Sequence, residues 1–333
     1  MTNLQVCPST LEPGHDTYSG KALRLLFDRS KISHILPYDR VDSDATIGVI
    51  QRGNGRISLS GVQEKISCVC RQGQIWMSED GEQGRYILKP IPASRHLQSR
   101  DNIPANEHVS MQIATQVYKI DTASNGLCFG QDGNPSYITR RFDVRPDGGK
   151  YAMEDFASLA GLTRRNGGSD YKYSNLSYEE CGELIERHAS AAIVDKLKFF
   201  RIVIYNFLIS NDDAHLKNFS LIQSEYGGYR LAPAYDLINT FIHLRQPRIF
   251  ALDKGLFREG MPLSDIQGVS GADFIQFGLR LGIREKMVRD ELERFCAEYD
   301  TVNELVSHSF LSEFLKDLYL QCFKYRRQML RKK

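Results

Sequence analysis

The segment 211–218 carries the residue types that phosphoryl transfer requires. It reads Asn-Asp-Asp-Ala-His-Leu-Lys-Asn and follows an apolar stretch, so we expect a solvated loop. Phosphoryl transfer needs a carboxylate to accept the proton of the acceptor hydroxyl, a cation near the phosphate and an oxygen ligand for magnesium. Asp213, Lys217 and Asn218 supply these three groups, with Asp213 as the general base. An ordinary polar loop would leave the next carboxylate unexplained.

That carboxylate belongs to Asp236, in the sequence Ala-Tyr-Asp. It comes directly after two short runs, 219–222 and 229–232, which alternate as the strands of a hairpin do. A lone Asp in a loop more often caps a helix or a turn. Its place one hairpin beyond Asn218 favours a magnesium site made by Asn218 and Asp236, because carboxylate and amide oxygens are the ligands that this ion prefers.

Lys89 is the candidate for a phosphate-binding cation. It ends a predicted strand, 85–88, and precedes Pro90, so its side chain is expected to extend from a rigid element. Glu107, on the helix that follows, is its expected ion-pair partner. Each residue taken alone is more often a surface charge, and only their order along the chain is typical of a kinase.

The segment 57–65 occupies the place of a loop that covers phosphates. It contains a single glycine, Gly61, and lacks the GxGxxG pattern of ordinary protein kinases, so hydroxyls and amides would replace the glycines. The alternative is a polar hairpin turn.

The elements that must position these groups change character near residue 140. The pattern before it predicts strands at 67–69, 74–77, 85–88 and 137–142 and one helix at 106–117. The pattern after it predicts helices at 154–160, 178–192, 195–210, 270–281, 284–299 and 302–331. We therefore expect an α+β fold with a small sheet-rich lobe, residues 1–139, and a larger helical lobe, residues 140–333.

Composition excludes several classes of protein. The chain has 333 residues and a net charge of +2, which argues against direct DNA binding. A terminal basic cluster at 326–333 is expected to be a solvated helix end. The seven cysteines show no paired spacing, and the longest apolar run, 199–209, is short and interrupted by Arg201 and Asn206. We expect a cytoplasmic protein without a membrane-spanning segment.

Six motifs together resemble the HipA-type serine/threonine kinases. They occur in order between Ser58 and Asp236: Ser-x-Ser-Gly-Val-Gln-Glu-Lys, Leu-Lys-Pro, Arg-Arg-Phe-Asp, Glu-Asp-Phe, Asn-x-Asp-x-His-x-Lys-Asn-x-Ser and Tyr-Asp. The resemblance implies a bilobal, protein-kinase-like fold and the use of ATP and Mg²⁺. It implies that phosphate contacts come from the serine loop and Lys89, an adenine hinge from 140–142, and a ribose contact from Asp143.

The full set of ATP-binding residues that the resemblance implies is Ser60, Gly61, Val62, Gln63, Glu64, Lys65, Lys89, Arg140, Arg141, Phe142, Asp143, His215, Leu216, Asn218 and Tyr235. The resemblance also implies Asp213 and Lys217 as catalytic residues and Asn218 and Asp236 as metal ligands. Loop-serine phosphorylation in HipA-type kinases implies autophosphorylation at Ser58 and Ser60.

The serine loop lies close to the start of the chain, whereas full-length HipA kinases place a further subdomain before it. The chain therefore resembles the short HipT toxin kinases of three-component toxin–antitoxin systems. That resemblance implies a small antitoxin protein that matches the missing subdomain, a DNA-binding antitoxin and a protein substrate. HipA-type toxins phosphorylate aminoacyl-tRNA synthetases, so a substrate of that class is expected.

Two other functions stay open. A metal-dependent phosphohydrolase could use Asp212, Asp213, His215 and Asp236 as ligands, but it would leave Lys89 and the serine loop without a role. A pseudokinase could bind nucleotide or partners only, but it would not require Asp213, Asn218 and Asp236 together.

Overall fold

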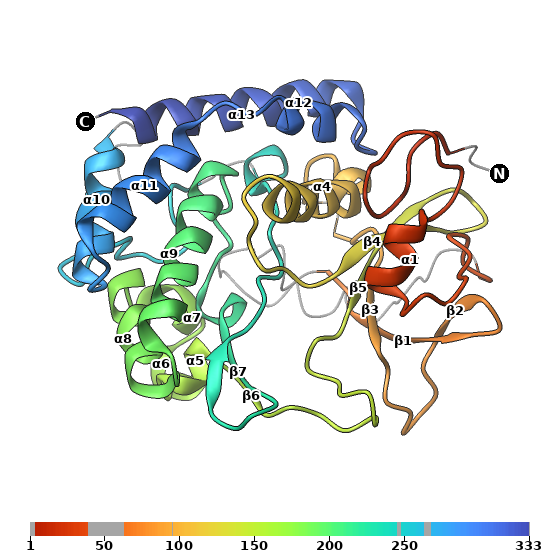
Figure 1. Ribbon diagram of the computed structural model, residues 1–333, viewed down its shortest axis with the longest axis horizontal. Coiled ribbons are helices and arrows are strands. Elements are labelled where there is room, and N and C mark those ends of the chain that lie inside the picture. Colours follow the sequence, from red (N-terminus) through yellow and green to blue (C-terminus); the bar gives the residue numbers. More distant parts are fainter. Residues whose placement is uncertain (1–3, 39–62, 95, 245–247, 263–267, 333) are drawn as a thin grey trace.

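The computed structural model describes residues 4–38, 63–94, 96–244, 248–262 and 268–332. A sheet-rich part and a larger helical part lie side by side, and the long helix α13 runs along the edge of both (Figure 1). The expected α+β architecture is therefore present. Whether the two parts divide at residue 139 stays a prediction.

The sheet-rich part is built on an antiparallel sheet of five strands in the order β2-β1-β3-β5-β4. The strands are β1 (Ile66–Arg71), β2 (Gln74–Met77), β3 (Tyr86–Lys89), β4 (Asn125–Phe129) and β5 (Pro135–Arg140). The central strand β3 ends at Lys89 because Pro90 has no backbone N–H to continue the ladder. Lys89, the candidate for a phosphate-binding cation, therefore lies at the end of the central strand of the sheet.

Alternation of side chains sends the two faces of this sheet to different helices. On one face, Leu88 and Ile138 pack with Leu26 of α1 (Gly20–Leu26). On the other face, Lys89 and Tyr137 form a register pair on the side of α4 (Ile103–Gln116), which packs against β4 and β5. Because Lys89 alternates with Leu88, it must point toward α4, the helix that carries Glu107.

The helical part surrounds α9, whose second half is almost completely buried. Its helices are α5 (Phe156–Leu159), α6 (Arg164–Gly167), α7 (Tyr171–Ser174), α8 (Tyr178–His188), α9 (Ala192–Leu208), α10 (Gly271–Arg280), α11 (Glu285–Cys296), α12 (Asp300–Ser307) and α13 (Glu313–Arg331). Short 3₁₀ turns lie at Arg100–Asn102, Leu216–Asn218 and Thr240–Ile242. Phe156, Phe199 and Phe219 pack against one another at the centre, with ring centroids 5.1–5.8 Å apart. This packing anchors the start of the hairpin beside the segment 211–218.

A second sheet connects the two halves of the candidate site. Its strands are β6 (Met153–Asp155), β7 (Ser220–Gln223) and β8 (Tyr229–Leu231), in the order β6-β7-β8. Gly227 and Gly228 have positive φ angles and close the expected β7–β8 hairpin. The chain that leaves β8 forms a parallel bridge from Ala234 to Thr122 and then reaches Asp236. The hairpin thus returns the chain to the sheet-rich part.

Several predicted elements need correction. Residues 153–155 form strand β6, and only Phe156–Leu159 is helical, because Asp155 caps α5 by accepting from the Ser158 amide. The predicted helix at 302–331 is two helices, α12 and α13. The pattern did not indicate β4, α1, α6 or α7, since short elements offer too few residues for a period to appear.

The terminal basic cluster is also not uniformly solvated. Arg326 is 4% exposed, and its Nε donates to the hydroxyl of Ser210, 3.1 Å away. Its guanidinium lies 4.8 Å from the ring centroid of Phe207. Burial lowers the pKa of Arg326. This arginine is therefore a packed part of the helical core, in contact with the residue directly before the segment 211–218. Among the described helices, none is long and apolar enough to cross a bilayer.

Candidate active site

A cluster of charged side chains joins the two parts of the molecule. The Nζ of Lys89 lies 2.6 Å from Glu107 Oε1 on α4 and also binds Asp236 Oδ1, beyond β8. Lys65 Nζ lies 3.2 Å from the other oxygen of Asp236. The ion pair between Lys89 and Glu107 is the one expected from the sequence, and the structure adds Asp236 to it.

Burial strengthens the electrostatic interactions among the charged groups of this cluster. The side chains of Lys89 and Glu107 are 4% and 3% exposed, so neither charge has much water to stabilise it. Burial alone would lower the pKa of Lys89, but Asp236 and Glu107 outweigh it and raise that pKa. Burial alone would raise the pKa of Asp236, but Lys65 and Lys89 hold it far below its usual range. Burial raises the pKa of Glu107, and Lys89 opposes that rise. Asp236 is thus ionised and Lys89 charged at neutral pH.

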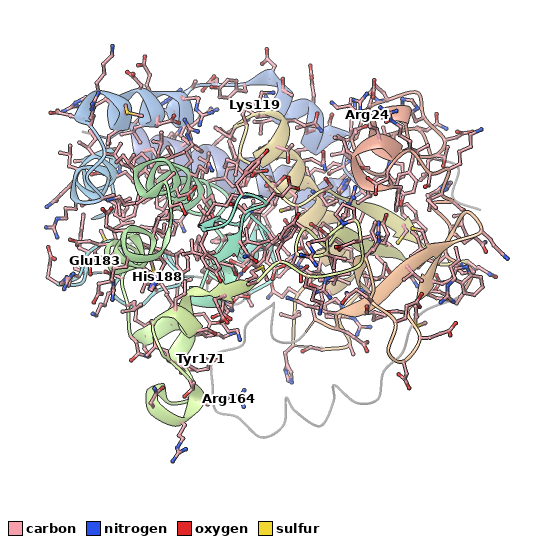
Figure 2. The ribbon with its side chains drawn as sticks, turned by 60° about the horizontal axis from the view of Figure 1, so that its bottom comes forward. Arg24, Lys119, Arg164, Tyr171, Glu183 and His188 are labelled. Carbon is pink, nitrogen blue, oxygen red and sulfur yellow. The ribbon has the colours of Figure 1, made fainter. Side chains whose placement is uncertain are left out.

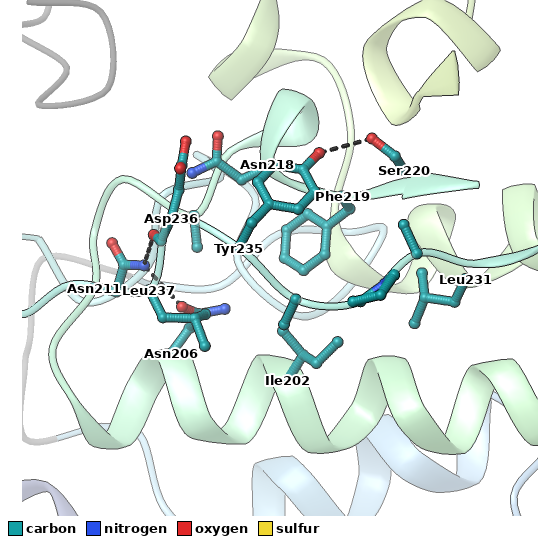
Figure 3. Close-up of a pocket in the computed structure, with 14 residues that line it drawn as sticks. Ile202, Asn206, Asn211, Asn218, Phe219, Ser220, Leu231, Tyr235, Asp236 and Leu237 are labelled. Atoms are coloured by element: carbon teal, nitrogen blue, oxygen red, sulfur yellow. Dashed lines mark hydrogen bonds between the residues drawn. The ribbon is translucent and has the colours of Figure 1, made fainter. Parts of the chain in front are cut away.

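The backbone at Asp236 has an unusual conformation. Its φ angle is 56°, in the left-handed region that a residue with a side chain rarely adopts. Asn211 supports the turn, because its amide Nδ2 donates to the carbonyl of Asp236 and to the side chain of Asn206 (Figure 3). The Oδ1 of Asn211 accepts from the amide of Asp213 at 3.2 Å. One amide side chain therefore holds both acidic segments together.

Asp213 is buried, with 4% of the residue exposed. The expectation of a solvated loop is wrong, because residues 211–216 are all buried and only Lys217 is exposed. Asp213 Oδ1 accepts a hydrogen bond of 2.7 Å from the hydroxyl of Tyr173, on α7. His215 Nε2 lies 3.8 Å from the same oxygen.

His215 is a neutral imidazole at pH 7, since burial lowers its pKa to about 4. Its Nε2 lies 2.9 Å from Nζ of Lys172, the residue before Tyr173. An ammonium group can only donate, so Nε2 is the acceptor and the proton of the ring is on Nδ1. The Nδ1 atom is buried and has no hydrogen-bond partner among the described residues.

Asn218 and Asp236 line one pocket over the end of α9, and their side chains extend to the same side of it (Figure 3). Asn218 Nδ2 donates to the carbonyl of Asp213 at 3.1 Å, which leaves its amide oxygen as a ligand. An ionised carboxylate beside an amide oxygen is a donor set that fits Mg²⁺. The predicted metal ligands therefore fit the ion.

The predicted nucleotide-binding residues at 140–143 form two ion pairs. Arg141 binds Asp143 through two hydrogen bonds, of 3.0 and 2.6 Å, and Arg140 pairs with Asp28. The ring of Phe142 lies 5.8 Å from that of Tyr235, whose hydroxyl hydrogen-bonds to Ser220. Phe142 therefore packs next to Tyr235, which lines the same pocket as Asp236, whereas residues 140–143 do not line that pocket themselves.

Other predicted residues lie at the edge or behind the site. Lys217 is exposed and its Nζ lies 3.5 Å from Asp155, while the side chain of Leu216 is in the core. Gln63 donates to the carbonyl of Pro90, which brings the described end of the serine loop next to Lys89. Glu64 and Lys65 follow it into β1. Ser58, Ser60, Gly61 and Val62 lie outside the described residues.

The ligand set proposed for a phosphohydrolase does not assemble. Among the described residues, no three His, Cys, Asp or Glu side chains are grouped to hold a metal. Asp236 faces two lysines, Asp213 faces Tyr173, and Asp212 accepts from the backbone amide of Arg248. The geometry therefore favours the kinase arrangement.

Sequence reasoning missed Lys172, Tyr173 and Asn211. The first two lie in the four-residue helix α7, which shows no period, and they are separated from Asp213 by about forty positions. Asn211 stood in the polar segment, but nothing in the pattern indicated which residue would connect its two ends.

These features define a bilobal, protein-kinase-like fold with a buried lysine–carboxylate cluster. The family model of the HipA-like C-terminal domain matches residues 57–302. The chain therefore belongs to the HipA-like family.

Curated relatives are similar in sequence to this chain, and two solved structures have a similar fold. A "Putative kinase" of Haemophilus influenzae is 26% identical and covers 94% of this chain and 92% of its own. A "Putative kinase" of Sinorhizobium fredii is 28% identical over 74% of this chain, which spans 59% of that relative. HipA of Shewanella oneidensis, solved with HipB and operator DNA, superposes with a TM-score of 0.65 at 18% identity, covering 89% of this chain and 73% of its own. The Helicobacter pylori kinase CtkA superposes with a TM-score of 0.51 at 16% identity, covering 79% and 93%.

Proposed function

We propose that this protein is a serine/threonine protein kinase that transfers the γ-phosphate of ATP to a protein hydroxyl. The observation that carries the proposal is the buried position of Lys89 between Glu107 and Asp236. A lysine held by a helix glutamate and next to a metal-binding aspartate is the arrangement that phosphoryl transfer requires.

Each side chain has a defined task in this reaction. Asp213 accepts the proton of the acceptor hydroxyl as the new P–O bond forms and the bond to ADP breaks. Asn218 and Asp236 would hold Mg²⁺, which neutralises charge on the phosphates. Lys65 and Lys89 bind phosphate oxygens, and Arg141, Phe142 and Asp143 border the nucleoside.

The proposed setting is a toxin–antitoxin system in which partners restrain the kinase. The solved HipA neighbour was crystallised with HipB and operator DNA, which supports a DNA-binding antitoxin as one partner. Leu25, Trp76 and Met77 are exposed on α1 and the edge strand β2, which supports a small antitoxin on the sheet-rich part. Co-expression with genomic neighbours should give a complex, and elution of this chain alone would remove the partner proposal.

We also propose autophosphorylation of Ser58 and Ser60. A phosphoserine adds a charge of about −1.5 to −2 and three acceptor oxygens, which would repel the phosphates of ATP and lower activity. Mass spectrometry should find phosphate on these serines in the active protein and none in Asp213→Asn.

Incubation with radiolabelled ATP and Mg²⁺ tests the main proposal against its alternatives. Label on serine or threonine of a protein supports a kinase. Release of free phosphate alone supports a phosphohydrolase, and retention of ATP without turnover supports a pseudokinase. Phosphoproteomics after induced expression would then show whether an aminoacyl-tRNA synthetase is the substrate.

A further inference from the structure

The four-residue helix α7 brings a tyrosine hydroxyl onto the candidate base. Tyr171 and Arg164 mark the α6–α7 segment, which projects at one edge of the helical part (Figure 2). The next residue but one, Tyr173, turns inward, is 1% exposed, and donates to Asp213 Oδ1 at 2.7 Å. A hydroxyl that donates to a buried carboxylate forms a short, strong and directional bond.

Two neighbours hold the tyrosine in this place. The ring of His215 meets the ring of Tyr173 edge to face, with centroids 5.1 Å apart. Lys172 spans both rings, since its Nζ lies 2.9 Å from His215 Nε2 and 5.0 Å from the centroid of Tyr173. The candidate base Asp213 therefore belongs to one connected set of contacts with Lys172, Tyr173 and His215.

This geometry suits a base that must be aimed. A carboxylate can rotate about its terminal bond, because that torsion has a broad profile. A donor fixed on Oδ1 stops the rotation, so the direction of Oδ2 is set as well. Proton transfer depends on such placement, and a misplacement of about 1 Å can cost about 100-fold in rate.

We propose that Tyr173 is a positioning residue that fixes the Asp213 carboxylate toward the acceptor hydroxyl, and that Lys172 supports it through His215. The inference rests on the proposed kinase function. It assigns α7 to the acceptor side of the site, opposite the cluster of Lys89 and Asp236.

The alternative interpretation is that Tyr173 only packs against the segment 211–218 and does not orient the base. The chain offers a matched control for it, because Tyr178 is also buried, at 2% exposure, and donates to the same segment. Its hydroxyl lies 2.9 Å from the carbonyl of Ala214 and so binds backbone instead of the base. A general effect of losing a buried hydroxyl should appear equally in both variants.

The experiment compares Tyr173→Phe with Tyr178→Phe in single-turnover phosphorylation at saturating ATP. Tyr173→Phe keeps the ring and should slow the chemical step by about 10- to 100-fold, with ATP affinity within about twofold of wild type. Tyr178→Phe should stay within about threefold in rate. Lys172→Met should slow the step by a smaller factor, also with unchanged ATP affinity.

Three results would overturn this inference but leave the proposed kinase function intact. The two Tyr→Phe variants could phosphorylate at equal rates, Tyr173→Phe could phosphorylate at the wild-type rate, or its loss of rate could be explained by weaker ATP binding. A denaturant titration provides a check that needs no activity. Introduced into the wild-type protein, Tyr173→Phe should lower the denaturant concentration at the unfolding midpoint by more than it does when introduced into the Asp213→Ala variant. Equal shifts in the two backgrounds would show that the hydrogen bond is absent. If wild type binds ATP but labels no protein, the proposed function itself fails.

Discussion

The two acidic residues of the candidate site are built in opposite ways. Asp236 is surrounded by the ammonium groups of Lys65 and Lys89, whereas Asp213 accepts from the neutral hydroxyl of Tyr173. Positive charge keeps Asp236 ionised and suits an oxygen that must bind a cation. A neutral donor fixes the direction of Asp213 without placing a positive charge on the oxygen that it binds.

The difference shows that burial alone does not define a functional carboxylate. Both side chains are largely removed from water, yet one is stabilised by ion pairs and the other by a directional hydrogen bond. An ion pair can change partners as ligands arrive: a lysine can leave Asp236 for a phosphate, and a metal ion can bind the carboxylate in its place. The hydrogen bond from the neutral hydroxyl of Tyr173 involves no cation that could leave for a ligand, and it serves to hold the carboxylate in one direction. We therefore expect changes around Asp236 to affect nucleotide and metal, and changes around Asp213 to affect the chemical step.

The largest effect should come from Asp236→Asn, which removes the charge that both Lys89 and magnesium use. Label transfer at saturating ATP and Mg²⁺ should fall to background. Asp147→Asn is the matched control, because that carboxylate pairs with Arg145 at an exposed position and neither residue belongs to the predicted site. Normal transfer by Asp236→Asn would remove it from the metal site.

The next effect should come from Asp213→Asn. An amide cannot accept the proton of the acceptor hydroxyl, so the chemical step should slow by about 10²- to 10⁴-fold. ATP affinity should change little, since Asp213 is on the acceptor side. Single-turnover rates and equilibrium binding of a fluorescent nucleotide measure the two quantities. An equal loss in both would mean that the residue serves binding.

A third prediction separates buried from exposed members of the lysine–carboxylate cluster. Glu107→Gln leaves Lys89 with one buried partner fewer and should lower the free energy of unfolding by about 3 kcal/mol. Lys65→Gln should cost less than about 1 kcal/mol, because the Lys65 side chain is 41% exposed and water screens its pair. Urea unfolding of both variants tests this, and equal losses would contradict the burial argument.

The last prediction concerns the response to acid of His243, which contacts Asn106 on α4, the helix that carries Glu107. His243 donates from Nδ1 to the carbonyl of Gln98 and accepts at Nε2 from Asn106, so it is satisfied only when neutral. Burial lowers its pKa to about 4. Its stabilisation is therefore complete above pH 6.5, the ordinary value, and is lost as pH falls toward 4, by about 3 kcal/mol at most.

Chemical unfolding between pH 7 and pH 4 measures this loss. His243→Gln should be less stable at pH 7 and should show a flatter decline. A decline as steep as that of wild type would assign the acid sensitivity to other groups, such as the buried His108 and His215, whose pKa values burial also lowers to about 4.

Much of the site could be predicted because chemical types and their order are local properties of a chain. The hairpin between Asn218 and Asp236 and the pairing of Lys89 with Glu107 followed from short motifs and from alternation along β3. Phosphoryl transfer narrows the choice further, since few residue types can serve as base, cation or magnesium ligand. The resemblance to the HipA-type kinases rested on short motifs of the same kind.

What the sequence by itself determined is therefore the list of reactive groups, the elements that carry most of them and the kind of chemistry they suit. Only the tertiary structure decided that Arg326 is buried against Ser210, that Asp236 adopts a left-handed conformation and that Tyr173 reaches Asp213. The physical reason is that periodicity reports which side of an element faces the core. It does not report which distant side chain meets which, because packing of the whole chain selects those contacts.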